Sequence, residues 1–193
     1  MRRLLLALPF ALLPLAVAHA ADEHDHDHEH ASLGAHVHGV ARLDMALDGR
    51  TLELELKTPA MNIVGFEHAA TSDADKMTLA LARETLLKPH GLFKIPEAAQ
   101  CTVTSQKVES ALFGDKDEDD DHDHAAGAED EHEHSEIEGH YQFTCNVPNV
   151  LNRLDLTQLF QSFPATKTIQ VQLVTPKRQL GAEVKPSNPV VKF

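Results

Sequence analysis

Apolar and polar residues alternate along two neighbouring stretches of the chain, at 37–47 and at 52–57. A period of two places every second side chain on the same face, which is typical of a β-strand buried on one side only. Between the two stretches, Asp48 and Gly49 form a strong signal for a two-residue hairpin turn. The pattern therefore predicts an antiparallel hairpin whose second strand ends at Pro59.

The spacing of apolar residues changes at 72–88 to the period of an α-helix. Ser72 is a suitable N-cap, and Asp73 and Asp75 favour a helix start because they lie in its first turn. Pro89 follows the expected end of the helix. The apolar stripe that we expect to pack against the core is formed by Ala74, Met77, Ala80 and Leu81.

Further short strands are predicted in the second half of the chain, at 101–113, 141–147, 154–156 and 169–173, with a helical turn at 159–163. A final strand pair is expected to involve 179–184 and 190–193. Many antiparallel strands with few helices predict a single α+β domain. We expect a mostly antiparallel β-sheet, covered on one face, with one main helix and short helical turns.

The first twenty residues have the parts of a secretory signal peptide. Arg2 and Arg3 precede an apolar stretch at 4–17, and residues 18–20 read Ala-His-Ala, the small-x-small pattern of a cleavage site. A membrane helix needs about 20 apolar residues, so a signal peptide is favoured over a membrane anchor. We expect residues 1–20 to be removed on export to the periplasm, and no later segment to enter a membrane.

The chain contains two cysteines, Cys101 and Cys145. Because the protein is expected to be exported, a disulfide between them is favoured over two free thiols. Our hypothesis is that the strands holding these cysteines pair around a charged insert, with the two cysteines opposite each other. The same register places Val103 opposite Phe143 and Ser105 opposite Tyr141.

The composition is strongly acidic, with 30 Asp and Glu against 17 Lys and Arg and a formal net charge of −13. Such a charge repels nucleic acid and attracts cations, so we expect no nucleic-acid partner. Two segments, 21–33 and 114–137, combine acidic residues with histidine and have little to bury. We interpret them as a disordered tail and a disordered insert of a metal-binding domain at 34–193.

Most of the 14 histidines lie in or beside these two segments. Neutral imidazole is a strong ligand for Zn²⁺ and related metals, and carboxylates bind the metal or orient a histidine. Alternate histidines of an extended chain lie about 6.5–7 Å apart, so a shared metal requires the chain to bend. We therefore expect several weak, adaptable sites from His24, His26, His28, His30, His122, His124, His132, His134 and His140.

His36 and His38 form a more specific candidate site, because they face the same way at the start of the first predicted strand. His68, beside Glu67, follows the second strand and is placed to fold back toward them. Two histidines with a third histidine or a glutamate suit a tetrahedral zinc site with an open position. The alternative for His68 is a plain surface position.

No sequence motif of an enzyme is present: there is no HExxH, no GxSxG and no glycine-rich phosphate loop. We expect a binding protein and no enzymatic activity. Zinc is the expected metal, but other divalent transition metals fit the same ligands, and Cu²⁺ exceeds Zn²⁺ in intrinsic affinity.

Several segments of the chain resemble the ZrgA-like family, whose members are zinc-regulated periplasmic proteins of Gram-negative bacteria, long catalogued as a domain of unknown function. They are HVHGVARLDMALDG, ELKTPAMNIVGFEHA, the FTC at 143–145, and LFQSFP followed by IQVQLVTP. By matching positions, the family motif includes His36, His38, Glu67 and His68. The histidines of the insert belong to the family's variable loop.

The resemblance implies zinc binding and a part in zinc acquisition, with delivery to an ABC importer or its solute-binding protein. The chain is less suited to be that solute-binding protein itself, which usually has two lobes and about twice the mass of one domain. Two alternatives remain: a periplasmic buffer against excess zinc, copper or nickel, and a structural protein whose His tracts only sense pH.

Overall fold

The computed structural model describes residues 37–114 and 135–192. The segment expected to be a signal peptide, the predicted tail at 21–33 and most of the predicted insert lie outside the described residues. So do His36 and all other candidate ligands before it or at 122–134. The described part of the chain is one α+β unit, as the sequence predicts.

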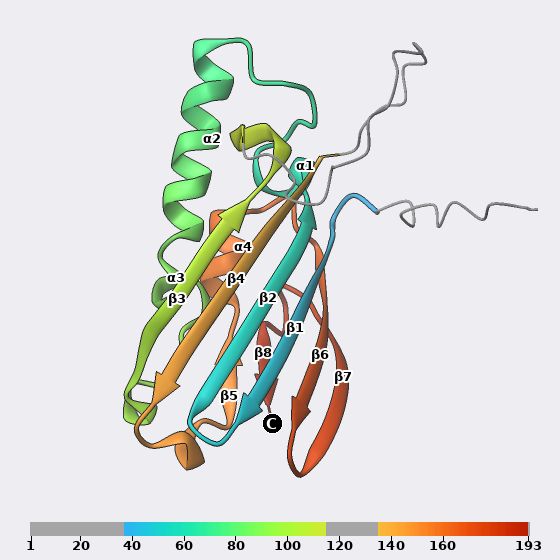
Figure 1. Ribbon diagram of the computed structural model, residues 1–193. Helices are drawn as coiled ribbons and strands as arrows, with labels where there is room; N and C mark the ends of the chain where they lie inside the picture. The colour runs from blue at the N-terminus through green and yellow to red at the C-terminus, as the bar shows by residue number, and fades with distance from the viewer. Residues whose placement is uncertain (1–36, 115–134, 193) are drawn as a thin grey trace, which may run out of the picture. The chain divides into compact units, whose positions relative to one another are not determined.

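A six-stranded sheet has the strand order β3-β4-β2-β1-β6-β7 (Figure 1). Its strands are β1 (Val40–Asp48), β2 (Thr51–Pro59), β3 (Cys101–Glu109), β4 (Glu136–Cys145), β6 (Thr168–Thr175) and β7 (Arg178–Val184). All neighbours in this sheet are antiparallel except β1 and β6, which are parallel. A two-stranded sheet pairs β5 (Arg153–Asp155) with β8 (Val190–Lys192).

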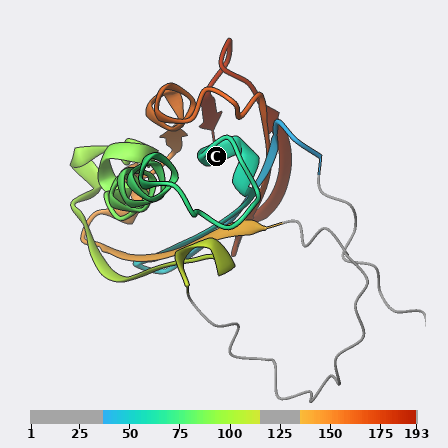
Figure 2. The same cartoon turned by 90° about the horizontal axis from the view of Figure 1, so that it is seen from above.

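The α-helices are α1 (Ala60–Ile63), α2 (Asp73–Leu86), α3 (Pro89–Phe93) and α4 (Thr157–Ser162), and short 3-10 turns lie at η1 (Glu97–Ala99), η2 (Ala111–Phe113) and η3 (Pro148–Val150). Figure 2 shows the helices and the small sheet on one side of the six-stranded sheet. The core lies between them, so the other face of the large sheet carries the polar residues of each alternation. Within the described residues, no helix is long and apolar enough to cross a membrane.

The predicted β1–β2 hairpin is confirmed, and its alternating leucines are buried, with Leu52, Leu54 and Leu56 each at most 2% exposed. The loop is one residue later than the Asp48-Gly49 signal suggested. Asp48 pairs with Thr51, so Gly49 and Arg50 form the loop. Gly49 has a φ of 56°, a conformation that glycine adopts without strain.

The disulfide between Cys101 and Cys145 is confirmed, and the two residues are opposite each other on β3 and β4. Val103 pairs with Phe143 as expected. The expected pairing of Ser105 with Tyr141 is wrong, because the register shifts between Val103 and Ser105. Beyond this irregularity Ser105 pairs with Gln142, and Gln106 pairs with Tyr141.

Helix α2 has the predicted position and N-cap, since the Ser72 hydroxyl accepts a hydrogen bond from the Asp75 amide at 3.1 Å. The predicted core stripe is wrong. Met77 and Leu81 are 66% and 58% exposed, whereas the buried face consists of Leu79, Ala82 and Leu86. Both stripes have helical spacing, and it is the second one, with Leu79, Ala82 and Leu86, that packs in the hydrophobic core.

The expected final strand pair is also different. The strand at 178–184 pairs with β6 in the large sheet, and the strand at 190–192 pairs with β5 in the small sheet. Leu154 of β5 and Val191 of β8 are almost fully buried, so the small sheet closes part of the core.

Candidate metal centre

His38 stands in a turn directly before β1. The Val40 amide donates to the Val37 carbonyl at 3.0 Å, and Gly39 between them has a φ of 86°. The carbonyl of Gly39 accepts hydrogen bonds from the amides of Lys167 and Thr168, at 2.7 and 3.0 Å. The turn is therefore attached to the start of β6, and the backbone of His38 is held close to the sheet.

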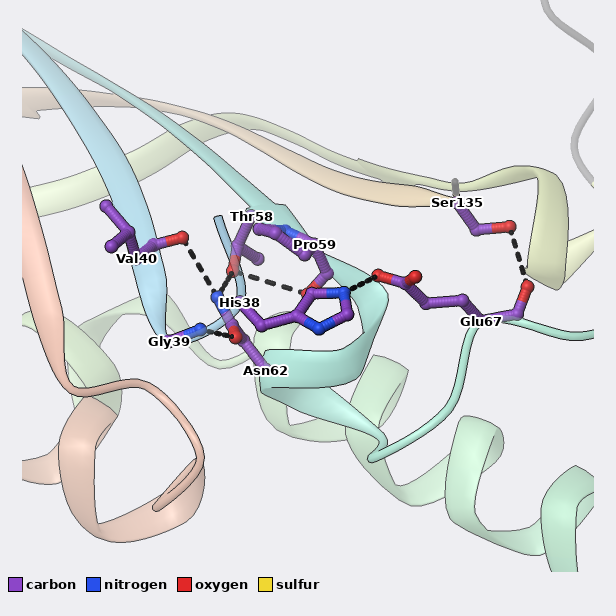
Figure 3. A network of polar contacts seen from close by, with 8 residues as sticks. All are labelled: His38, Gly39, Val40, Thr58, Pro59, Asn62, Glu67 and Ser135. Atoms are coloured by element: carbon purple, nitrogen blue, oxygen red, sulfur yellow. Dashed lines mark hydrogen bonds and ion pairs between the residues drawn. The ribbon is translucent and has the colours of Figure 1, made fainter. Parts of the chain in front are cut away.

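Asn62 fixes the other side of this turn, as Figure 3 shows. Its side chain is 1% exposed; Oδ1 accepts from the Gly39 amide at 2.6 Å, and Nδ2 donates to the Val40 carbonyl at 2.9 Å. Nδ2 also donates to the Thr58 hydroxyl at 3.0 Å. Helix α1 begins where β2 ends, and β2 ends beside the start of β1, so the hairpin itself brings Asn62 to the turn.

Glu67 reaches the imidazole of His38, with 3.0 Å between Glu67 Oε1 and His38 Nε2 (Figure 3). The Glu67 side chain is 15% exposed and that of His38 is 50% exposed, so the pair is open to solvent on the histidine side. The Glu67 carbonyl accepts from the Ser135 hydroxyl at 3.3 Å, which ties this segment to the start of β4.

The distance suits two roles. Ligands about 2 Å from a tetrahedral zinc ion lie about 3.3 Å apart, so His38 and Glu67 are close to the spacing of two ligands of one ion. In the absence of metal, the same contact is a hydrogen bond or ion pair that orients the imidazole.

His68 lies at an exposed position. Its ring stacks on Phe66, with 4.8 Å between centroids, and its Nδ1 lies 3.0 Å from the Ala69 carbonyl. The structure thus brings Glu67, rather than His68, to His38.

Glu67 and His68 also line an open cleft of about 980 Å³. Its other walls come from α2 and from the 3-10 turn η2, and Ser135 contributes to it as well. Lys76 and Arg83 add basic groups to this cleft, and the Arg83 guanidinium lies 5.0 Å from the ring centroid of Phe113.

A second group of ligand types lies on the polar face of the sheet, where Glu55, Glu138 and His140 have side-chain atoms within 4.8 Å of one another. Sequence reasoning named His140 but missed both glutamates. The signal in the sequence was Glu-x-His at 138–140, because alternate residues of a strand share a face. The partner Glu55 is known only from the pairing of β2 with β4.

Comparison with known proteins agrees with this chemistry. The model of a family described as "ZrgA family zinc uptake protein" matches residues 35–193. No curated protein matches the chain.

Proposed function

The chain belongs to the ZrgA family of zinc uptake proteins, and from this premise we propose that it captures zinc in the periplasm and delivers it to an ABC importer or its solute-binding protein. The observation that carries the proposal is the pair of His38 Nε2 and Glu67 Oε1, 3.0 Å apart at the edge of the folded unit. Imidazole and carboxylate are both zinc ligands, and an exposed pair leaves positions free for exchange.

We propose that His36 supplies a third ligand to this pair. It precedes His38 by only two positions in the chain, which keeps the two imidazoles within reach of one ion. His68 is close in sequence and is available as a fourth ligand after a rotation away from Phe66.

The two His-rich segments have a different part in the proposal. They supply weak, rapidly exchanging sites that collect zinc and raise its concentration near the folded domain. Their ligands are His24, His26, His28, His30, His122, His124, His132 and His134.

The periplasm is proposed as the compartment because residues 1–20 have the pattern of a signal peptide. The disulfide between Cys101 and Cys145 is consistent with an oxidising compartment. The family's description concerns zinc uptake and names no catalytic activity.

Zinc titration by calorimetry tests this proposal. The chain from residue 21 is compared with a variant in which the eight tract histidines named above are serine. We expect the variant to lose the weak sites and to keep tight binding, which His38→Ala then weakens by at least about tenfold. His90→Ala is the matched control, because His90 is exposed and its ring packs in a T-shaped arrangement with Phe143, 5.3 Å between centroids.

Two other outcomes would change the conclusion. Loss of all binding in the tract variant would make the tracts the metal store and the domain a scaffold. Absence of zinc binding in the native sequence would remove the zinc proposal altogether.

The alternative function is a buffer against excess zinc, copper or nickel, which the same His tracts would serve. Expression distinguishes the two. Induction by zinc scarcity supports uptake, whereas induction by metal excess supports buffering.

A further inference from the structure

The polar face of the six-stranded sheet carries a group of ligand types that is separate from His38 and Glu67. Strands β4 and β2 are neighbours in the large sheet (Figure 1). Glu138 and His140 occupy alternate positions of β4, and Glu55 lies directly opposite His140 on β2. The three side chains are all partly exposed. Because two paired strands hold their backbones, their mutual positions are set by the sheet and not by a loop.

The side-chain atoms of this group are close enough to share one ion. One ligand atom from each residue lies within 4.8 Å of the other two. His140 Nε2 and Glu138 Oε2 are 3.3 Å apart, which is about the spacing of two ligands of a tetrahedral zinc ion. The fourth position would be open to water or to a ligand from a partner.

A cation already lies at this position. The ammonium of Lys57 is 2.9 Å from Glu55 Oε1 and 3.6 Å from Glu138 Oε1. Two carboxylates that share one lysine are held together without metal, and the lysine is flexible enough to turn away.

A second observation comes from Asp44, which pairs with Glu55 across β1 and β2. The Asp44 carboxylate is paired with Arg42, whose Nε donates to Oδ2 at 2.7 Å; the other oxygen, Oδ1, is shielded from solvent and has no hydrogen-bond partner in the described structure. Asp44 lines the same open depression, of about 500 Å³, as Glu55 and His140. The Oδ1 atom therefore offers one further acceptor on the face that carries the three ligand groups.

We propose that Glu55, Glu138 and His140 form a second zinc site on the open face of the sheet, and that Lys57 is the resident cation that zinc displaces. The site deepens the proposed function, since it takes the same metal, but its residues are independent of His38 and Glu67. Competition by Lys57 keeps the affinity moderate, which suits a site that passes its metal on.

Chemical modification of histidine tests the site in the complete exported chain. Diethyl pyrocarbonate is applied at increasing concentrations of zinc chloride, and modification at each histidine is followed by mass spectrometry. His140 is 43% exposed in its side chain and is therefore reactive without metal. We expect zinc to protect His140, while His90, which is exposed and belongs to neither group, stays reactive.

Two substitutions make the test specific, because they should shift the zinc concentration for half protection of His140 in opposite directions. Glu138→Gln removes a ligand and should raise the zinc concentration for half protection of His140 at least about tenfold. Lys57→Gln removes the competing cation and should lower that concentration by about fivefold. Glu53→Gln is the matched control, since Glu53 lies on the same face of β2 and bonds Gln142. It should change neither value.

The outcome at His38 separates this inference from the proposed function. Protection of His38 without protection of His140 would overturn the second site and leave the proposed function intact. Protection of His140 without protection of His38 would support the second site and overturn His38 as a receptor. Equal protection of His140 in the native chain, Glu138→Gln and Lys57→Gln would also overturn the site proposed here.

Discussion

At the scale of single residues, one buried amide organises the candidate receptor. Asn62 bonds the Gly39 amide and the Val40 carbonyl, directly after His38, and it also bonds the Thr58 hydroxyl. The buried side chain of Asn62 thus connects β1, the end of β2 and α1. A hydrophobic residue at this position could not satisfy the Gly39 amide, which explains why a polar residue is tolerated in the core.

Replacement of Asn62 should therefore be costly. We expect Asn62→Ala to lower the free energy of unfolding by about 3 kcal/mol, because the Gly39 amide loses its acceptor inside the protein. Urea denaturation followed by circular dichroism measures the change. Asn152→Ala serves as the control, since Asn152 is exposed and should change stability little.

Replacement of Tyr141 should change the free energy of unfolding in the opposite direction. Its side chain is 3% exposed, its hydroxyl has no hydrogen-bond partner in the described structure, and burial raises its pKa. Tyr141→Phe should keep the packing against Phe93 and raise the free energy of unfolding by about 1 kcal/mol, because an unsatisfied polar group is removed. Thermal unfolding measures the effect, and a lower midpoint would indicate that the hydroxyl is satisfied in solution.

At the scale of elements, the stability of a short helix depends on hydrogen bonds at its ends. Helix α4 spans Thr157–Ser162, too short to be stable alone. The carboxylate of Asp155, in β5, accepts hydrogen bonds from the amide and the hydroxyl of Thr157, at 2.9 and 2.6 Å. The hydrogen bonds from Thr157 are the main cause of a lowered pKa at Asp155. One side chain thus connects the small sheet to the start of the helix.

Asp155→Ala should cost about 1 kcal/mol of unfolding free energy at neutral pH, because the two hydrogen bonds from Thr157 are lost. A lowered pKa in the folded state means that the charged carboxylate stabilises the protein above the ordinary pKa of 3.8. The contribution is then lost as the pH falls through the lowered, folded-state pKa. The difference between native and variant should therefore disappear in acid.

Asp155→Asn is the matched variant, because it keeps the oxygen acceptor and removes the charge. Its stability should be close to native at neutral pH and should lack the acid dependence. Urea denaturation between pH 7 and pH 2 measures both variants. A difference between native and Asp155→Ala that persists undiminished at the lowest pH would contradict a role for the charged form.

At the scale of the whole molecule, the disulfide closes a long segment of chain. Cys101 and Cys145 are 44 residues apart, and the bond joins the first residue of β3 to the last residue of β4. Bonding the two strands limits the conformations of the unfolded chain, which stabilises the folded state.

Removal of the disulfide by Cys101→Ala with Cys145→Ala should lower the free energy of unfolding by about 4 kcal/mol, the value for a loop of this length. Guanidinium denaturation measures it. Reductant should destabilise the native protein by a similar amount and leave the double variant unchanged. If reductant leaves the unfolding free energy of the native protein unchanged, the result would argue against the bond.

Zinc affinity of the complete protein should depend on pH. Protons compete with zinc for imidazole, which titrates near pH 6.5 as a residue type, so affinity should fall as the pH decreases through that region. Competition with a zinc indicator between pH 8 and pH 5 provides the measurement. An affinity that is constant over this range would exclude binding through histidine.

Local features of this protein were determined by the sequence alone. These features are the β1–β2 hairpin, the position and cap of α2, the disulfide and the α+β class. They follow from the periodicity of apolar residues, from turn residues and from the number of cysteines, all of which can be read from short segments or from the composition. The candidate ligands His38 and His140 were also evident, because histidine is rare enough for its clustering to indicate metal binding.

Only the tertiary structure decided which of these residues meet. The buried face of α2, the shifted register at Ser105, the approach of Glu67 to His38 and the grouping of Glu55 with Glu138 and His140 all depend on strand pairing between distant segments. A local pattern cannot predict such pairing. A helix with two apolar stripes has similar local energy whichever stripe is buried, and a strand has similar local energy in either of two registers. Packing of the whole core selects one of them.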